Sequence, residues 1–157
     1  MFNGAFTPIL LLALAAILVV AAAIDVRTFT ISNRLNLTVA LLAPLYWASA
    51  ALPLWPGVGI QLASGAAVFV LLAGAFYAGM MGGGDVKLAA ALALWFSPAS
   101  TIKFLVLTSL AGGVLTLVVL AWHRAKHREG RPEIPYGVAI AFGGLAILAQ
   151  RFLNQFA

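Results

Sequence analysis

The chain has 157 residues, of which 64% are hydrophobic and only 8% are charged, and its mean hydropathy is +1.08. A water-soluble domain carries about 25% charged residues, so this composition excludes a water-facing exterior and indicates a chain embedded in a lipid bilayer. The absence of cysteine excludes disulfides, thiolate metal sites and cysteine nucleophiles. The net charge of +5 is interleaved with apolar runs instead of forming one basic face, so we expect no nucleic-acid partner.

Hydropathy divides the chain into six apolar stretches. They cover residues 5–24, 35–52, 58–80, 86–96, 102–122 and 135–153. A hydrocarbon core about 30 Å thick requires about 20 helical residues, and the fourth stretch is too short. We expect that stretch to tilt little, to continue into Ser97 and Pro98, or to begin below the lipid surface. The pattern predicts an all-α polytopic membrane protein, a single domain over residues 1–157 that forms a bundle of six transmembrane helices.

The distribution of cations favours one orientation of these helices. With the N-terminus outside, the connections around residues 25–34, 78–87 and 122–134 face the cytoplasm. They contain most of the basic residues, namely Arg27, Arg34, Lys87, Arg124, Lys126, Arg128 and Arg131, and the other side keeps only Lys103 and Arg151. Because Lys and Arg are retained on the cytoplasmic side, we predict that both termini lie outside. No basic residue precedes the first stretch, which favours a retained helix over a cleaved signal peptide.

Two of the four acidic residues stand at the ends of apolar stretches. Glu129 and Glu133 belong to a basic loop, where water and neighbouring arginines solvate them. Asp25 instead closes the first stretch and Asp85 opens the fourth. Since the first helix is expected to run inward and the fourth to run outward, both carboxylates are expected at the cytoplasmic face, where they can meet.

Each of these aspartates also has a purely structural interpretation. Asp85 follows a glycine and precedes a helix, as an N-cap does. Asp25 lies near a helix C-terminus, where the helix dipole disfavours negative charge, but Arg27 is available to pair with it. Both aspartates being structural is less favoured than either one alone.

A pair of carboxylates suits a particular kind of chemistry. Two like charges held close together do not both ionise readily, so one acid is ionised and the other protonated at neutral pH. Such a pair holds a water molecule, takes its proton and polarises a carbonyl, which hydrolyses an amide without a metal or a covalent intermediate. His123 and His127 stand four residues apart but lack carboxylate or thiolate company, so we expect no metal and no other cofactor.

Three glycines, Gly82, Gly83 and Gly84, directly precede Asp85. Without a Cβ they allow close approach of another backbone. Gly79 and Gly83 also have the G-x-x-x-G spacing that promotes tight helix contacts in lipid. The sequence is therefore compatible with helix packing alone or with a pliable, unwound turn beside the acid.

Three segments resemble motifs of the type IV prepilin peptidases. GGGDVK, residues 82–87, is similar to the G-x-G-D signature of intramembrane aspartic proteases with its family-specific lysine. IDVRTFTISNRLN, residues 24–36, resembles the motif after the first helix, and IPYGVAIAFGGL, residues 134–145, resembles the last-helix motif. The segments occur in the family's order, and the six-span layout covers nearly the whole chain. In lacking paired C-x-x-C motifs, the chain resembles the compact branch of the family that serves Flp/Tad-type pili.

The resemblance implies an aspartic endopeptidase with Asp25 and Asp85 as its catalytic pair and residues 82–84 as the active-site loop. Its substrate is a prepilin or pseudopilin, whose short basic leader is removed at the cytoplasmic face of the bacterial inner membrane before assembly of a type IV pilus or a type II secretion pseudopilus. We expect no N-methyltransferase activity. Residues expected to support the site or the substrate are Asn33, Lys87, Pro135, Tyr136 and Gly137.

Some of these supporting residues have alternative interpretations. The family commonly has Ile-Pro-Asn where this chain has Ile31-Ser32-Asn33, and we expect Asn33 to cap the second helix. Lys87 either stabilises charge in the site or anchors its helix by snorkelling. Pro135 either lines the cleft with Tyr136 and Gly137 or only starts the last helix.

The alternative function is an ion- or proton-coupled membrane transport protein, because intramembrane acids are typical of ion pathways. That function predicts acids near the bilayer midplane and broken-helix repeats. Here the acids are expected at the cytoplasmic rim, and the sequence shows no internal repeat.

Overall fold

The fold of the chain comes from a computed structural model, which describes residues 6–127, 130 and 132–154. Within these residues the regular structure is entirely helical. The elements are α1 (Phe6–Thr28), α2 (Asn33–Ser49), a short helical segment η1 (Leu54–Val58), α3 (Gly59–Tyr77), α4 (Gly83–Ala93), α5 (Pro98–Ala125) and α6 (Tyr136–Leu153). The predicted all-α fold is confirmed. Three residues used in the predictions lie outside the described residues: Arg128 and Arg131, which were counted among the cytoplasmic cations, and Glu129, which was placed in the basic loop.

In the part of the chain that the structure describes, four helical segments are long and apolar enough to cross a membrane. They are α1, the continuous segment Leu54–Tyr77, α5 and α6. Six spans, the placement of the termini outside and the single domain over residues 1–157 stay predictions. The outward faces of α3 and α5 carry large exposed apolar side chains such as Val70, Leu110 and Leu117, as a lipid-facing surface requires.

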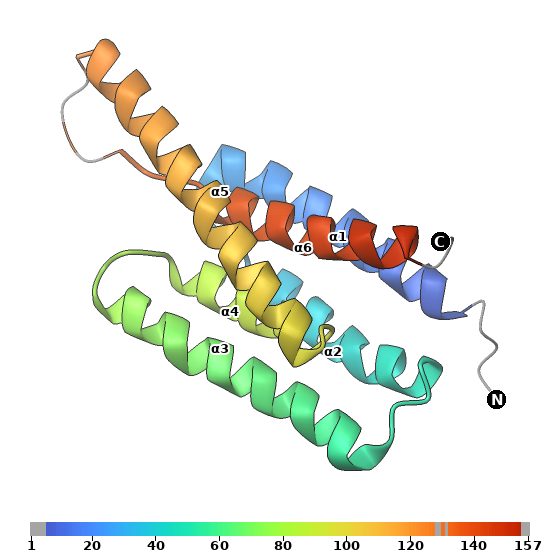
Figure 1. Ribbon diagram of the computed structural model, residues 1–157. Coiled ribbons are helices and arrows are strands. Elements are labelled where there is room, and N and C mark those ends of the chain that lie inside the picture. The colour runs from blue at the N-terminus through green and yellow to red at the C-terminus, as the bar shows by residue number, and fades with distance from the viewer. Residues whose placement is uncertain (1–5, 128–129, 131, 155–157) are drawn as a thin grey trace.

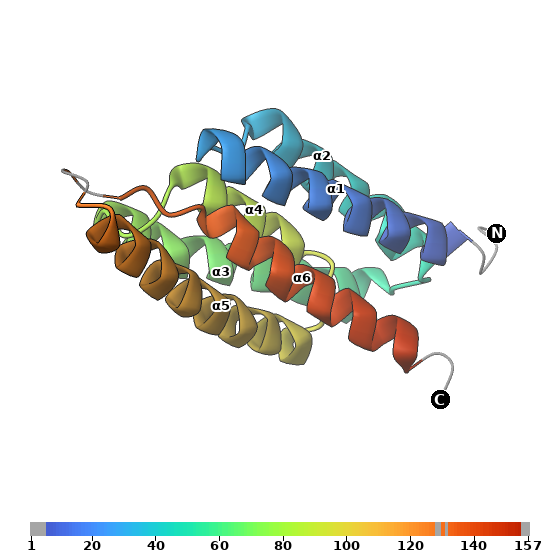
Figure 2. The ribbon, with the colours of Figure 1, turned by 90° about the horizontal axis from the view of Figure 1, so that it is seen from above.

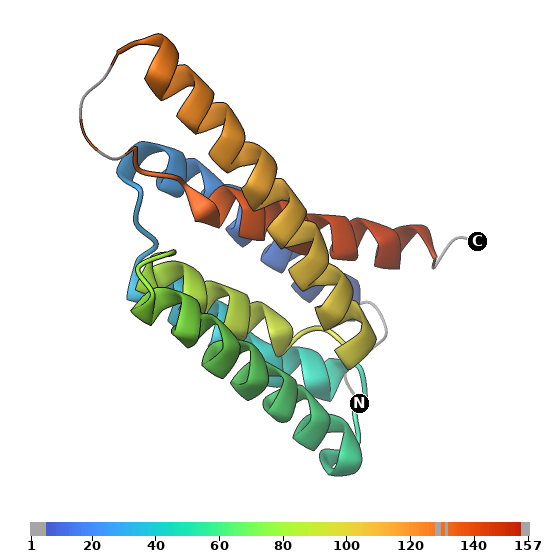
Figure 3. The ribbon, with the colours of Figure 1, turned by 60° about the vertical axis from the view of Figure 1, so that its left-hand side comes forward.

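Successive helices run back and forth along the bundle. The connections that follow α1, α3 and α5 lie together at one end, on the left in Figures 1 and 2, whereas α1 begins and α6 ends at the opposite end. Figure 3 shows the same arrangement from the side, with α5 crossing in front of α6. This topology brings the end of α1, the start of α4 and the start of α6 to one end of the molecule.

The short helix α4 lies inside the bundle, in contact with α2, α3 and α6. Seven of its 11 residues are buried, which explains why its sequence is apolar on nearly all sides. Two indoles fasten its C-terminal end to α2: Trp47 Nε1 donates to the Leu94 carbonyl at 2.8 Å, and Trp95 Nε1 donates to the Val39 carbonyl at 3.0 Å. The fourth apolar stretch is therefore a buried helix that starts before its predicted bound and ends at Ala93.

Candidate active site

The first carboxylate, Asp25, stands in the last turn of α1 and is 2% exposed. The helix ends because Phe29 adopts a positive φ of 52°, with its N–H donating to the Asp25 carbonyl at 2.8 Å. Arg27 is exposed, and residues two apart on a helix do not share a face. Arg27 therefore does not accompany Asp25 into the interior, which removes the main structural explanation for that aspartate.

Asp25 points at the first turn of α6. The backbone N–H groups of Gly137 and Val138 lie close to its carboxylate, where a helix N-terminus favours negative charge. A Cβ on Gly137 would lie 2.8 Å from Asp25 Oδ2 and 2.9 Å from its Cγ, so only glycine permits this approach. Pro135 is buried and directly precedes α6, in agreement with its interpretation as a helix starter.

The second carboxylate, Asp85, is the third residue of α4 and is 8% exposed. Gly82, and not Asp85, is the N-cap residue of this helix. The Gly82 N–H donates to Asp85 Oδ2 at 3.3 Å, so the carboxylate still satisfies one amide at the helix start. The expected N-cap is thus wrong in position, although the interaction with the helix terminus is present.

The glycines before Asp85 differ in conformation from the expected unwound turn. Gly82 is extended, with φ of −74° and ψ of 147°, but Gly83 and Gly84 already belong to α4. The chain reverses earlier, at Gly79, whose φ is +68°. Gly79 lies outside any helix, and an added Cβ there would meet nothing within 4 Å, so the two glycines do not act as a pair in one helix contact. Gly83 alone faces another helix, since its Cβ would lie 3.3 Å from the Phe76 ring of α3.

The two carboxylates lie close enough to interact. Asp85 is outside the four helical segments that are long enough to cross a membrane. The pKa of its carboxyl group is raised to about 6, first because burial removes water and second because Asp25 is nearby, whereas the Gly82 N–H opposes the rise. Within the described part of the chain, Asp25 Oδ2 and Asp85 Oδ1 are buried without a hydrogen-bond partner. Each acid therefore has one buried oxygen whose hydrogen-bonding capacity is unused.

Ile31, which the sequence did not single out, connects the two halves of this site. A Cβ on Gly84 would lie 2.6 Å from the Ile31 carbonyl oxygen, and one on Gly137 would lie 2.5 Å from Ile31 Cδ1. The α1–α2 connection is thus wedged between the start of α4 and the start of α6. Gly84 provides the close backbone approach predicted for the glycine run.

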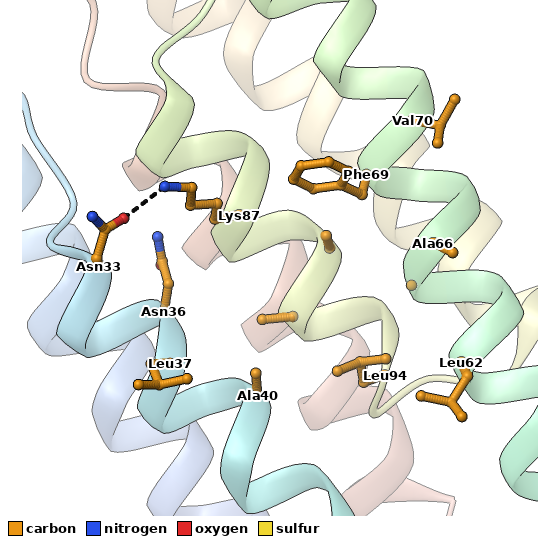
Figure 4. A pocket seen from close by; sticks show the side chains of 13 residues that line it. Asn33, Asn36, Leu37, Ala40, Leu62, Ala66, Phe69, Val70, Lys87 and Leu94 are labelled. Atoms are coloured by element: carbon orange, nitrogen blue, oxygen red, sulfur yellow. Dashed lines mark hydrogen bonds between the residues drawn. The ribbon is translucent and has the colours of Figure 1, made fainter.

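A polar cluster fixes α2 to the start of α4, as Figure 4 shows. Lys87 Nζ donates to Asn33 Oδ1 at 2.8 Å, and the buried Asn36 donates through Nδ2 to the Gly84 carbonyl at 2.9 Å. The expected cap at Asn33 is wrong, because Ser32 caps α2 by accepting the Leu35 N–H at 3.3 Å. The sequence did not identify Asn36 as a supporting residue, although a single amide side chain in the apolar part of a helix indicates a buried hydrogen bond.

A cavity of about 340 Å³ lies beside Asp85, and its wall includes Gly82, Met81, Tyr136 and Glu133. Tyr136 borders this cavity, whereas Pro135 and Gly137 are not part of its described wall, and the supporting role of these three residues stays a prediction. Glu133 is exposed, as expected of a solvated loop residue, and it also borders the same cavity as Asp85. Lys87 is not part of this wall. Among the residues that the structure describes, no three histidine, aspartate or glutamate side chains are grouped as metal ligands.

Fold and site together define a multi-pass helical membrane protein with two buried, interacting carboxyl groups at one end of its bundle. The chain belongs to the type IV leader peptidase family, whose sequence pattern matches residues 12–117, about two thirds of the chain. The predicted family is thereby confirmed, and membership implies a membrane-embedded peptidase that acts on prepilin-type substrates. The match includes both aspartates and ends before α6. No curated protein and no solved structure matches the chain.

Proposed function

We propose that the protein is an aspartic endopeptidase that removes the short basic leader of a prepilin or pseudopilin, using water activated between Asp25 and Asp85. The observation that carries this proposal is the pairing of two buried carboxyl groups, each with an oxygen that has no partner among the described residues. A buried carboxylate oxygen without an ion-pair or hydrogen-bond partner is costly, so such oxygens are typical of a site that acts on a ligand.

The proposed reaction uses one ionised and one protonated carboxyl group. The ionised group takes a proton from water while the water oxygen attacks the scissile carbonyl carbon, and the protonated group donates a hydrogen bond to the carbonyl oxygen. The tetrahedral intermediate then collapses, the C–N bond breaks and the leaving amine receives a proton. The N–H groups of Gly137 and Val138 orient Asp25, and the N–H of Gly82 orients Asp85.

The location of the site supports cleavage at a membrane surface. Both aspartates lie at helix ends, on the side of the bundle that holds the α3–α4 and α5–α6 connections. The cations of those connections favour the cytoplasm, so the proposed active site faces the cytoplasmic side of the bacterial inner membrane. Carboxylates at helix ends do not fit the alternative of a transport protein, which needs acids near the midplane.

The cysteine-free sequence supports assignment of this chain to the Flp/Tad-type branch and to leader cleavage without N-methylation. A methyl transfer that depends on paired C-x-x-C motifs has no counterpart in these 157 residues. Mass spectrometry of the processed pilin N-terminus tests this part of the proposal. A methylated N-terminus produced by this chain alone would contradict it.

The proposal is tested by co-expression with a prepilin, followed by a gel that resolves the leader-sized shift. We expect Asp25→Asn and Asp85→Asn each to abolish processing, because each substitution is isosteric but removes a carboxylate. As a control for folding and insertion, both variants must be present in the membrane in wild-type amounts and must have a melting temperature in detergent at or above that of the wild type. Processing by either folded variant would refute the carboxylate pair.

A further inference from the structure

A second cavity adjoins the one beside Asp85. This groove, about 520 Å³, lies between α3 and α5, with α4 and α6 at its base, and we call it the α3–α5 groove. Met80, Met81 and Tyr136 line both the groove and the cavity beside Asp85. These three residues border both spaces, so the groove and the cavity lie side by side along the direction that an extended ligand would follow.

The chemistry of the wall changes along this path. Beside Asp85, the described wall contains two carboxylates, Asp85 and Glu133, and no lysine or arginine. The α3–α5 groove contains no charged residue, and its wall is mostly aliphatic side chains and glycine, with the hydroxyls of Thr108, Ser109 and Thr116. A ligand that complements both parts is cationic at one end and apolar at the other.

Small residues make the groove suitable for a helix. Ala75, Gly112 and Gly113 lie along its wall, and small residues let helices approach closely in lipid. A Cβ added at Gly113 would meet nothing within 4 Å, so the backbone of α5 is uncovered at this point. An apolar helix entering from the bilayer can therefore pack directly against α5.

Two other grooves formed by the described residues lack this combination. The groove between α2 and α3 has a volume of about 540 Å³, but its polar end holds Lys87 beside Asn33, which repels a cationic segment (Figure 4). The groove between α5 and α6, about 510 Å³, is apolar throughout and includes neither Asp85 nor Glu133. Charge complementarity therefore selects the α3–α5 groove.

We propose that the α3–α5 groove holds the apolar helix that follows the scissile bond, while Glu133 at the mouth of the adjoining cavity attracts the cationic residues that precede it. This inference rests on the proposed function, since it takes the substrate to be a prepilin. The scissile bond then lies at the junction formed by Met80, Met81 and Tyr136, next to Asp85.

The groove is tested by filling it. Gly113→Leu places a side chain in the groove, away from both aspartates. Two control variants place the same side chain elsewhere. Gly74→Leu changes another open glycine, on α3, and Ala66→Leu fills the α2–α3 groove. We expect Gly113→Leu to reduce processing of full-length prepilin about tenfold or more, in the range of steric exclusion from an apolar pocket, and both controls to remain near wild type. A short peptide that spans the cleavage site without the apolar helix is expected to be cut equally by all.

Cross-linking gives a readout that does not depend on turnover. Because the chain has no cysteine, Gly113→Cys and Gly74→Cys can each be introduced into the inactive Asp85→Asn protein with a single reactive thiol. We expect a disulfide between Gly113→Cys and a cysteine placed in the apolar helix of the prepilin, and little from Gly74→Cys. Equal cross-linking at both positions would contradict the proposal that the prepilin helix binds in the α3–α5 groove. Wild-type processing of full-length prepilin by Gly113→Leu would contradict it as well.

The role of Glu133 is tested by charge reversal. Glu133→Lys is expected to reduce processing of the natural basic leader severalfold and to favour a leader whose lysines and arginines are replaced by glutamate, a change in preference that a folding defect does not produce. Unchanged preference would remove Glu133 from the proposal. If the wild-type protein cuts no prepilin, the proposed function itself fails. If the wild-type protein cuts prepilin, and the groove variant and the Glu133 variant cut it as the wild type does, only this inference fails.

Discussion

Gly137→Ala is expected to reduce activity strongly although it adds only one methyl group. The added Cβ would lie 2.9 Å from Asp25 Cγ and 2.8 Å from Asp25 Oδ2. Ile31 Cδ1, at 2.5 Å, is the end of a flexible side chain and can move aside, but the carboxylate is held within the interior. Asp25 must therefore retreat from the first turn of α6.

The size of the effect follows from these contacts. Carbon atoms in ordinary contact are about 3.5 Å or more apart, so the Asp25 carboxyl group has to move by at least about 0.5 Å. A displacement of about 1 Å at a catalytic group costs about 100-fold in rate, so we expect a loss of about ten- to a hundredfold. Gly137→Ser should behave similarly, because it also adds a Cβ.

The assay is the initial rate of leader removal in detergent or liposomes at equal protein concentration. Gly74→Ala is the matched control, since its methyl group enters open space on another helix and is expected to leave the rate unchanged. A melting temperature close to wild type separates a displaced carboxylate from a misfolded protein. Gly137→Ala protein that is folded and fully active would refute the proposed contact between Asp25 and α6.

Four further outcomes are expected. Asn36→Leu removes the buried hydrogen bond to the Gly84 carbonyl and should lower the free energy of unfolding by about 1–3 kcal/mol, seen as a lower melting temperature in detergent. Ser32→Ala removes the cap of α2 and should cost about 1 kcal/mol in the same measurement, whereas an unchanged melting temperature would exclude a capping role. Lys87→Gln should change the rate less than about threefold, because Lys87 is exposed and outside the cavity beside Asp85, and a larger loss would place it in the chemistry. The charge of ionised Asp25 helps to raise the pKa of Asp85 to about 6, so that value describes loss of the pair's second proton. A reaction that needs one protonated acid should lose activity as the pH rises through about 6, and protonation of the remaining carboxylate should reduce activity again at lower pH; a flat profile over roughly pH 4–9 would contradict the coupled pair.

The gross features of this molecule followed from hydropathy and charge. Apolar stretches predicted the helices well because a helix in lipid must satisfy all of its own backbone hydrogen bonds. Their alternation then put Asp25 and Asp85 at one end. Boundaries were less accurate: α1 continues to Thr28, beyond its apolar residues, because a helix persists into the polar interface until a residue such as Phe29 reverses the chain.

The fine structure of the site depended on tertiary contacts that local patterns do not contain. Asn33 was expected to cap α2, but Lys87 from another helix engages it and leaves the cap to Ser32. An unwound turn was one expectation for the glycine run, but Gly84 belongs to α4. A glycine is needed there because the Ile31 backbone lies against it. Glu133 is exposed as expected, but its position beside the Asp85 cavity depends on the fold and is not contained in its sequence neighbours.

The two tryptophan hydrogen bonds at the far end of α4 have a consequence for the distant acid. Asp85 lies nine residues before Leu94, which corresponds to about 14 Å of rigid helix. Since the indoles of Trp47 and Trp95 lock α4 against axial sliding relative to α2, the helix acts as a spacer of constant length. The height of Asp85 relative to α2 is then set by protein-to-protein bonds, so bilayers of different thickness should leave that height unaltered.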